Sequence, residues 1–347
     1  MRVPRVAIVV LLLAACAGAG PDQSAVVDAL ADQGLVPQLG AASADLDELA
    51  GAVAAFCSER DAASLAAARD AWARAKSSWE AAELAVYYGP ATMLSTLSKV
   101  DYTPISPEGI EELLGSETPI DYDYIDNRSA STRRGLGGVE YVLFASDDVA
   151  GADRSCEYLV AASSVAADAA EELAVAWTTA VDGAEPFQQT FTSSMDSNDS
   201  ISDVVGAYVE TLKRQTLFEL GMALGISSPE PNPDALPEGR ARAGAAVFAS
   251  QLDSIGTTLR VGDESSLIEL IRSRSDDVAE RIDTLVAGSS EVLDGVDGPM
   301  AEFVAEQPDA ATDLYERLSE LNTLFESDVV SLLDLTLGFC DSDGDSG

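Results

Sequence analysis

Two tryptophans and a glutamate share one face of a predicted helix. Trp72 and Trp79 lie seven residues apart and Glu83 follows Trp79 by four, so all three project from the same side of an α-helix. A carboxylate beside two indoles could ligate a cation or exchange a proton in a partly apolar site. Alternatively, the two tryptophans are ordinary core residues and the glutamate lies at the edge of the core. Taken alone, this spacing favours the core interpretation.

A second group of residues combines three glycines with a glutamate and a tyrosine. Gly135, Gly137 and Gly138 open a predicted helix that carries Glu140 and Tyr141. Glycine costs a helix roughly 1 kcal/mol per residue, so three at a helix start indicate close approach of another backbone or a special turn. A flexible helix entry explains them equally well. The segment is not a phosphate-binding loop, because the pattern GxxxxGK[ST] is absent.

The composition removes several classes of chemistry. The chain of 347 residues has no histidine, which excludes Ser-His-Asp and Cys-His nucleophiles, HExxH zinc sites and histidine-ligated haem. Its 60 acidic residues outnumber 20 basic ones, and the formal net charge of -40 repels phosphate backbones, which argues against nucleic-acid binding. Catalysis or binding must therefore rely on carboxylates, hydroxyls, thiols or the shape of the surface.

The first residues form a targeting segment. A short basic region precedes an apolar run at 6–13 that is too short to span a bilayer. The run Leu-Ala-Ala-Cys at 13–16 resembles a bacterial lipobox, in which the chain is cut before the cysteine and the cysteine is acylated; an ordinary secretory peptide cut near Ala19 is the alternative. We predict a signal peptide at 1–15 and a membrane anchor at Cys16. Because Ala17 is not aspartate, we expect a periplasm-facing lipoprotein of the outer membrane.

The remaining cysteines would lie in an oxidising compartment. Cys57, Cys156 and Cys340 allow at most one disulfide, and the sequence does not choose among the three pairings. A catalytic thiol is disfavoured, because no histidine is present to activate it.

The hydrophobic pattern predicts an all-α fold. Apolar residues recur three and four apart in segments rich in alanine and leucine. The predicted helices are 43–56, 62–88, 135–146, 153–181, 200–225, 238–259, 265–287, 289–305 and 308–337. Residues 116–134 are predicted to form a long loop, and four prolines at 226–237 mark a domain boundary. We expect two antiparallel helical bundles at 42–226 and 238–340, after a tether at 16–41 and before an acidic tail at 341–347.

Three motifs resemble those of the imelysin family, a group of bacterial envelope proteins. The first runs from Trp72 through Arg74, Trp79, Glu80 and Glu83 to Gly-Pro at 89–90. The second, GLGGVEYVLF at 135–144, stands in place of the hallmark GxHxxE, and the third, LGFCDSDGD at 337–345, is similar to the ending LG-F-DGD. The resemblance covers residues 43–345 and implies two helical bundles whose motifs meet in a cleft.

The resemblance also implies a link to iron or haem acquisition, and some family members carry a metallopeptidase label. Gly137 stands where the motif has its histidine, so we expect no enzyme activity. Glu83 and Glu140 without an imidazole would hold a divalent or ferric ion only weakly, with a shift towards hard cations. The residues that would line the cleft are Trp72, Arg74, Trp79, Glu80, Gly135, Gly137 and Tyr141.

Two functions fit these observations. The first is a non-catalytic envelope lipoprotein that binds an iron-related ligand or an iron-uptake partner protein; retained carboxylates in one cleft would favour it. The second is a structural or adaptor lipoprotein with a degenerate metal site, which the missing histidine favours. If Glu83 and Glu140 are close, their repulsion requires a proton, a metal ion, Arg74 or another cation.

Overall fold

The computed structural model describes residues 20–87, 93–145, 153–181, 183–193, 197–237 and 239–338. Throughout these ranges the regular structure is helical, with one isolated bridge between Val181 and Ala184. The all-α prediction is therefore confirmed. Cys16 with the predicted signal peptide, Cys340 and the predicted acidic tail lie outside the described residues.

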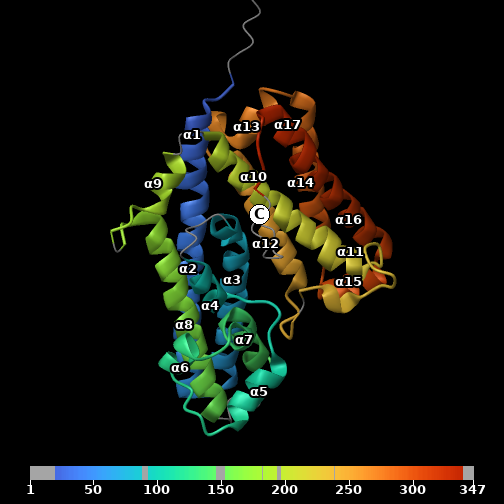
Figure 1. The fold of residues 1–347 in the computed structure, drawn as a ribbon. Helices are drawn as coiled ribbons and strands as arrows, with labels where there is room; N and C mark the ends of the chain where they lie inside the picture. Colours follow the sequence, from blue (N-terminus) through green and yellow to red (C-terminus); the bar gives the residue numbers. More distant parts are fainter. Residues whose placement is uncertain are drawn as a thin grey trace, which may run out of the picture.

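In Figure 1 the N-terminal group of helices occupies the left and lower parts, and its last helices cross to the right, beside the C-terminal group. Two six-residue π-helical segments, η1 and η5, interrupt the N-terminal group. Its elements are α1 (Gln23–Ala29), η1 (Leu30–Leu35), α2 (Val36–Glu59), α3 (Ala62–Tyr87), α4 (Leu94–Val100), α5 (Pro107–Gly115), α6 (Tyr122–Asn127), the 3-10 turn η3 (Ser131–Arg133), α7 (Gly135–Leu143), α8 (Asp153–Thr178), α9 (Phe187–Thr192), α10 (Ser197–Lys213), η5 (Arg214–Glu219) and α11 (Leu220–Ala223).

The C-terminal group lies on the right of Figure 1 and follows the proline-rich connection. Its elements are the 3-10 turn η6 (Pro233–Ala235), α12 (Gly244–Arg260), the 3-10 turn η7 (Asp263–Ser265), α13 (Leu267–Arg272), α14 (Asp276–Asp294), α15 (Met300–Glu306), α16 (Pro308–Thr323), the π segment η8 (Leu324–Val329) and α17 (Val330–Leu333).

Helix α3 joins the two groups. It packs against α2 and α7 of the first group and against α12 of the second, while α10 packs against α16. Its side chains Ala68, Ala75 and Ala82 are fully buried, and such small residues let neighbouring helices approach closely. One contiguous set of buried apolar side chains runs through both groups. The proposed domain boundary at 226–237 stays a prediction.

Several segments differ from the sequence-based expectation. Helices α4, α5 and α9 lie where no helix is predicted, and α13, α14 and α15 replace the two predicted helices 265–287 and 289–305. The predicted tether is wrong for residues 23–41, which are helical and bury Val26, Leu30 and Leu39. The predicted loop at 116–134 contains α6, because Asp121 accepts a hydrogen bond from the amide of Tyr124 at 2.9 Å and so caps the helix.

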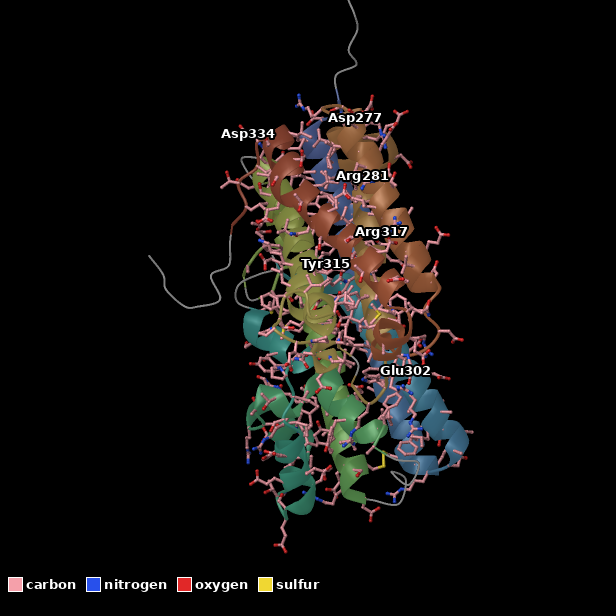
Figure 2. All side chains as sticks on the ribbon, turned by 90° about the vertical axis from the view of Figure 1, so that its right-hand side faces the viewer. Asp277, Arg281, Glu302, Tyr315, Arg317 and Asp334 are labelled. Atoms are coloured by element: carbon pink, nitrogen blue, oxygen red, sulfur yellow. A yellow bond between two sulfur atoms is a disulfide. The ribbon has the colours of Figure 1, made fainter. Side chains whose placement is uncertain are left out.

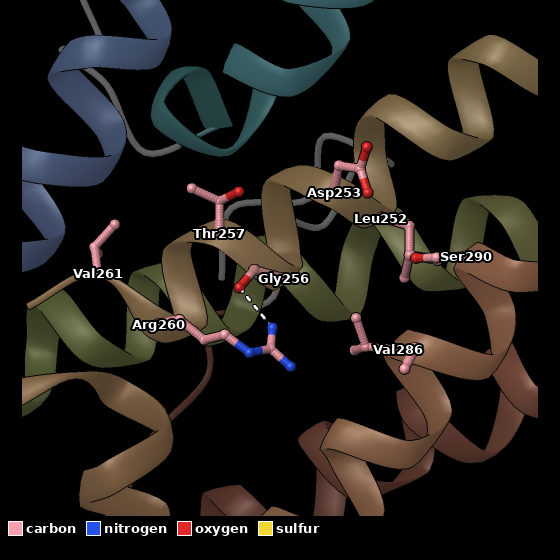
Figure 3. Close-up of a pocket in the computed structure, with 9 residues that line it drawn as sticks. Leu252, Asp253, Gly256, Thr257, Arg260, Val261, Val286 and Ser290 are labelled. Atoms are coloured by element: carbon pink, nitrogen blue, oxygen red, sulfur yellow. Dashed lines mark hydrogen bonds between the residues drawn. The ribbon is translucent and has the colours of Figure 1, made fainter. Parts of the chain in front are cut away.

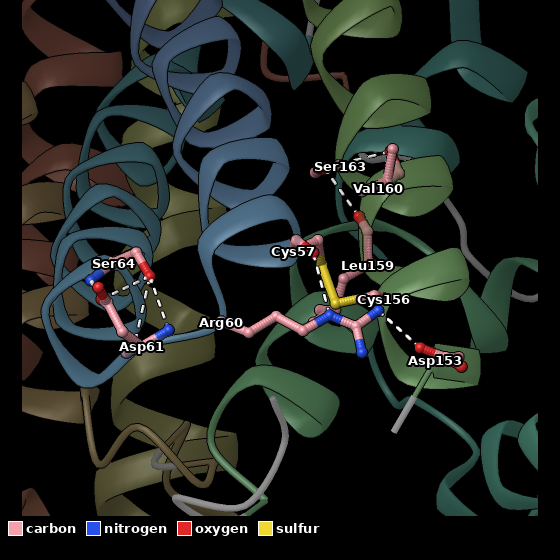
Figure 4. The surroundings of a disulfide bond; sticks show 9 residues. All are labelled: Cys57, Arg60, Asp61, Ser64, Asp153, Cys156, Leu159, Val160 and Ser163. Atoms are coloured by element: carbon pink, nitrogen blue, oxygen red, sulfur yellow. Dashed lines mark hydrogen bonds and ion pairs between the residues drawn. A yellow bond between two sulfur atoms is a disulfide. The ribbon is translucent and has the colours of Figure 1, made fainter. Parts of the chain in front are cut away.

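A disulfide joins Cys57 at the end of α2 to Cys156 near the start of α8 (Figure 4). The two Cα atoms lie 5.4 Å apart, and the residues are 99 positions apart in the sequence. Next to the bridge, Arg60 Nη2 contacts Asp153 Oδ1 at 2.6 Å. The expectation of at most one disulfide is met within the described residues. The bridge links the end of α2 covalently to the start of α8.

The outer face of the C-terminal group is highly charged. In Figure 2, Arg281 on α14 and Arg317 on α16 project from this face. Arg281 pairs with Glu320, and Arg317 Nε contacts Asp313 Oδ2 at 2.7 Å. Among the described helices, none combines the length and the apolar character that a membrane span requires.

Candidate functional site

Charged side chains of the N-terminal group meet the amide of Gln251 from the C-terminal group inside the protein, between α3, η5 and α12. We call this set the charge cluster; its members are Lys76, Glu80, Glu83, Asp101, Arg214, Glu219 and Gln251. Glu80 is only 4% exposed, and Lys76 and Asp101 are 17% and 12% exposed. Charges removed from water to this degree need close partners of opposite sign.

Lys76 connects two of the acidic side chains. Its Nζ donates to Asp101 Oδ2 at 2.6 Å and to Glu80 Oε1, four residues further along α3. Burial alone would lower the pKa of Lys76, but attraction to Asp101 and Glu80 outweighs burial and raises it. The ammonium therefore stays charged over the physiological pH range.

A chain of amides fixes the other oxygen of Glu80. Gln251 Nε2 on α12 donates to Glu80 Oε2, and Gln215 Nε2 on η5 donates to Gln251 Oε1 at 2.7 Å. Both amide side chains are buried. Glu80 thus has a partner on each oxygen, and α12 is tied to α3 through it.

Arg214 is the second cation of the cluster. It approaches Glu83 with two nitrogens, Nη2 at 2.5 Å from Oε2 and Nη1 at 3.3 Å from Oε1, which is the bidentate geometry that suits guanidinium and carboxylate. Its Nε also lies 3.8 Å from Glu219 Oε1. Arg214 and Glu219 are five residues apart in η5, the spacing of a π-helical hydrogen bond, and π segments of this kind are frequent at functional sites.

Burial sets the protonation behaviour of the acidic residues around Arg214. Burial raises the pKa of Glu83, and repulsion from Glu80 adds to it against the attraction of Arg214. Burial likewise raises the pKa of Glu219 to about 7, although Arg214 opposes the rise. Burial therefore favours the protonated form of both carboxyls.

Glu140 has different partners. On α7, its Oε1 accepts the backbone N–H of Ala241 at 2.7 Å, in the segment that leads into α12. A Cβ at Gly239, where φ is +55°, would lie 2.0 Å from the same oxygen, so a side chain there would displace the Glu140 carboxylate. Arg240 stacks 3.5 Å above the ring of Tyr141 and donates to the Tyr141 carbonyl at 2.6 Å. Burial raises the pKa of Glu140 despite the hydrogen bond from Ala241.

The glycines of the second motif permit close packing, as one of the two sequence interpretations expected. Gly135 has φ +74°, and a Cβ there would lie 2.6 Å from the carbonyl oxygen of Val100. A Cβ at Gly137 would lie 2.8 Å from Ile105 Cγ2 and 3.9 Å from Asp101 Oδ1. The position that carries histidine in the motif is therefore beside the charge cluster.

The aromatic residues of the first motif belong to the core. Trp72 and Trp79 are 2% and 3% exposed. Trp72 Nε1 donates to the Leu136 carbonyl at 3.0 Å, and its ring meets Phe144 edge-on with centroids 5.3 Å apart. Trp72 thus holds α3 against α7, and both tryptophans are buried in the core, as the structural alternative considered above expects.

Arg74 lies away from the cluster. Its side chain is 55% exposed and contacts Glu48 at 3.3 Å. The cations that neutralise the motif carboxylates are instead Lys76 and Arg214, which the sequence interpretation did not select. Lys76 could have been found from its i,i+4 spacing to Glu80, whereas Arg214 is 131 positions from Glu83 and gave no local signal.

The present arrangement does not fit a metal ion. Glu83 is paired with Arg214 and Glu140 with the Ala241 amide, while Lys76 takes an oxygen of both Glu80 and Asp101. Throughout the described ranges, no group of three or more His, Cys, Asp or Glu side chains is placed to hold a metal. Within the described residues Glu83 and Glu140 share no hydrogen-bond partner, and their shared metal site stays a prediction.

Two hollows on the described surface lie outside the charge cluster. A hollow of about 630 Å³ between α12 and α14 includes Asp253, Arg260 and Val286 (Figure 3), and there Arg260 Nη1 donates to the Gly256 carbonyl at 2.7 Å. A second hollow of about 380 Å³ adjoins it through Asp253 and contains Arg74. No residue of the cluster lines either one, so neither is a substrate pocket for its carboxylates.

Comparison with known proteins agrees with this architecture. The model of the family described as Imelysin (Peptidase M75) matches residues 35–326. No match was found among curated proteins. An imelysin-like protein from Psychrobacter arcticum 273-4 has a similar structure, with 19% identity over 92% of this chain and 100% of that chain and a TM-score of 0.75.

A second solved structure has the same fold. It is named a "putative iron-regulated protein A precursor" from Parabacteroides distasonis ATCC 8503, and it shows 17% identity over 91% of this chain and 97% of that chain, with a TM-score of 0.75. The family model spans most of the chain, and the motifs around Glu83 and Glu140 lie within the match. The chain therefore belongs to the imelysin family.

Proposed function

We propose that this imelysin-family protein is a non-catalytic lipoprotein of the cell envelope, anchored through Cys16, that supports iron-related uptake by binding a partner protein. One observation carries the proposal: the carboxylates of Glu80, Glu83 and Asp101 are bonded to Lys76, Arg214 and Gln251. A general acid or base must come within hydrogen-bond reach of its substrate. Glu80, at 4% exposure, has no such access.

The surface next to the cluster supports binding to a protein. Leu217 and Phe218 on η5 are 43% and 63% exposed, and Ile226 is 48% exposed. Ser227, next to Ile226, donates to the Leu217 carbonyl, so the three apolar side chains lie in one region. Grouped exposed apolar side chains often mark an interaction site. We call this region the apolar patch.

The link to iron rests on the family and on the name of the similar Parabacteroides protein. A deletion strain grown under iron restriction tests it. We expect reduced uptake of radioactive iron, restoration by the wild-type gene, and no restoration by the double variant Leu217→Ser/Phe218→Ser. The matched control is Val160→Ser/Val175→Ser on α8, where both valines are 37% exposed; it should restore uptake.

Two results would contradict the proposal. Normal iron uptake in the deletion strain would remove the link to iron. Peptide cleavage by the purified protein, abolished by Glu80→Gln, would show an enzyme.

A structural or adaptor lipoprotein is the second candidate. The bonds within the charge cluster favour it as well, because a degenerate metal site needs no ligand. It predicts normal iron uptake in the deletion strain together with altered recovery of other envelope proteins in cross-linked complexes. The uptake measurement therefore separates the two candidates.

A further inference from the structure

Lys76 occupies the place that a cation would take between two acidic side chains. Its Nζ contacts Glu80 Oε1 and lies 2.6 Å from Asp101 Oδ2. Because both oxygens contact one nitrogen, they are no farther apart than about 5 Å, a span that one cation with ligand distances of about 2.0 to 2.6 Å can bridge. We propose that Lys76 is a built-in cation of the charge cluster, which takes the place of a metal ion between Glu80 and Asp101 and keeps metal ions out of the native protein.

The surroundings of the ammonium favour this arrangement over a metal ion. Gln251 holds the second oxygen of Glu80, so this carboxylate cannot turn both oxygens towards an incoming ion. Gly137, beside Asp101, offers no side-chain ligand. Lys76 is moreover attached to the chain, and a tethered group competes at an effective concentration in the millimolar range or above. A free ion would have to displace it and leave a buried ammonium without its partners.

The matching test is to remove the ammonium while keeping its apolar stem. We expect the mature Lys76→Met protein to bind one Ca²⁺ or Mn²⁺ ion at least tenfold more tightly than the wild type, measured by calorimetry with the metal alone. The same ions should raise the melting temperature of Lys76→Met and leave that of the wild type unchanged. In Lys76→Met/Asp101→Asn one of the two charges is also removed, and the gain in affinity should disappear.

Lys99 provides a matched control. Its Nζ lies 2.5 Å from Asp126 Oδ1, and the two side chains are 23% and 18% exposed, but this pair contains one carboxylate instead of two. Lys99→Met should therefore gain no metal affinity. A gain equal to that of Lys76→Met would show that loss of any partly buried lysine attracts ions.

Three outcomes would overturn the proposal. The wild type binds an ion as tightly as Lys76→Met; the folded Lys76→Met protein binds none; or Lys76→Met stays unfolded both with and without the ions. This inference goes beyond the proposed function, because it concerns the cluster alone. Failure of Lys76→Met to bind an ion would overturn this inference and leave the iron-uptake proposal untouched. Normal iron uptake in the deletion strain would contradict the proposed function and leave the ion-binding result untouched.

Discussion

Glu219 offers a quantitative test of the charge cluster. Burial raises the pKa of its carboxyl from an ordinary value of 4.5 to about 7. A raised acid pKa means that the folded state holds the proton more strongly than the unfolded state, so folding is penalised once the unfolded chain ionises. The penalty grows as pH rises from about 4.5 and is complete above about 7. At roughly 1.4 kcal/mol for each pH unit, it reaches about 3 kcal/mol.

The variant Glu219→Gln mimics the protonated carboxyl at every pH. We expect it to raise the free energy of unfolding by about 3 kcal/mol at pH 8 and by less than about 1 kcal/mol at pH 5. Urea denaturation of both proteins at the two pH values measures the difference. Glu230→Gln, at an exposed loop position, serves as the control and should change little at either pH. The reasoning about burial is refuted if Glu219→Gln gains equally at both pH values or loses stability at pH 8.

Three further predictions follow from other parts of the molecule. Cys57→Ser should lower the free energy of unfolding by about 4 to 5 kcal/mol, since the bridge closes a loop of 99 positions, and dithiothreitol should give the wild type the same denaturation curve. Gly135→Ala should cost about 2 kcal/mol or more in thermal denaturation, whereas Gly40→Ala, whose added Cβ meets no atom within 4 Å, should be neutral or stabilising. Cys16→Ser should leave an unprocessed or soluble precursor in cell fractionation; unchanged processing and membrane association would contradict the lipid anchor.

The helices were predictable wherever the apolar period is regular. From Leu39 to Phe56, buried residues recur at steps of three and four, and the prediction of a helix over most of this stretch is confirmed. The same spacing of three and four continues towards the N-terminus at Val27, Leu30, Ala31 and Leu35, so the pattern there already indicates a helix and the tether prediction is wrong.

The candidate site was predictable only in part. Residue spacing placed Trp72, Trp79 and Glu83 on one helix, and the glycines indicated close backbone approach. The partners of the carboxylates come from distant parts of the chain, since Gln251 reaches Glu80 across 171 positions. A charged residue such as Arg214 looks like an ordinary solvated position until the fold buries it, so pairings of this kind require the structure.

The hydrogen bond between Glu140 and the Ala241 amide makes one backbone proton a reporter for the whole arrangement. That amide lies in the segment between the proline-rich connection and α12, outside any helix, where exchange with solvent deuterium is ordinarily fast. While Glu140 accepts this hydrogen bond, the Ala241 amide proton should exchange slowly. Loss of the hydrogen bond should accelerate its exchange. A partner protein or an added ion that loosens the junction between the two helix groups would thus be visible at a single residue, without any change in helix content.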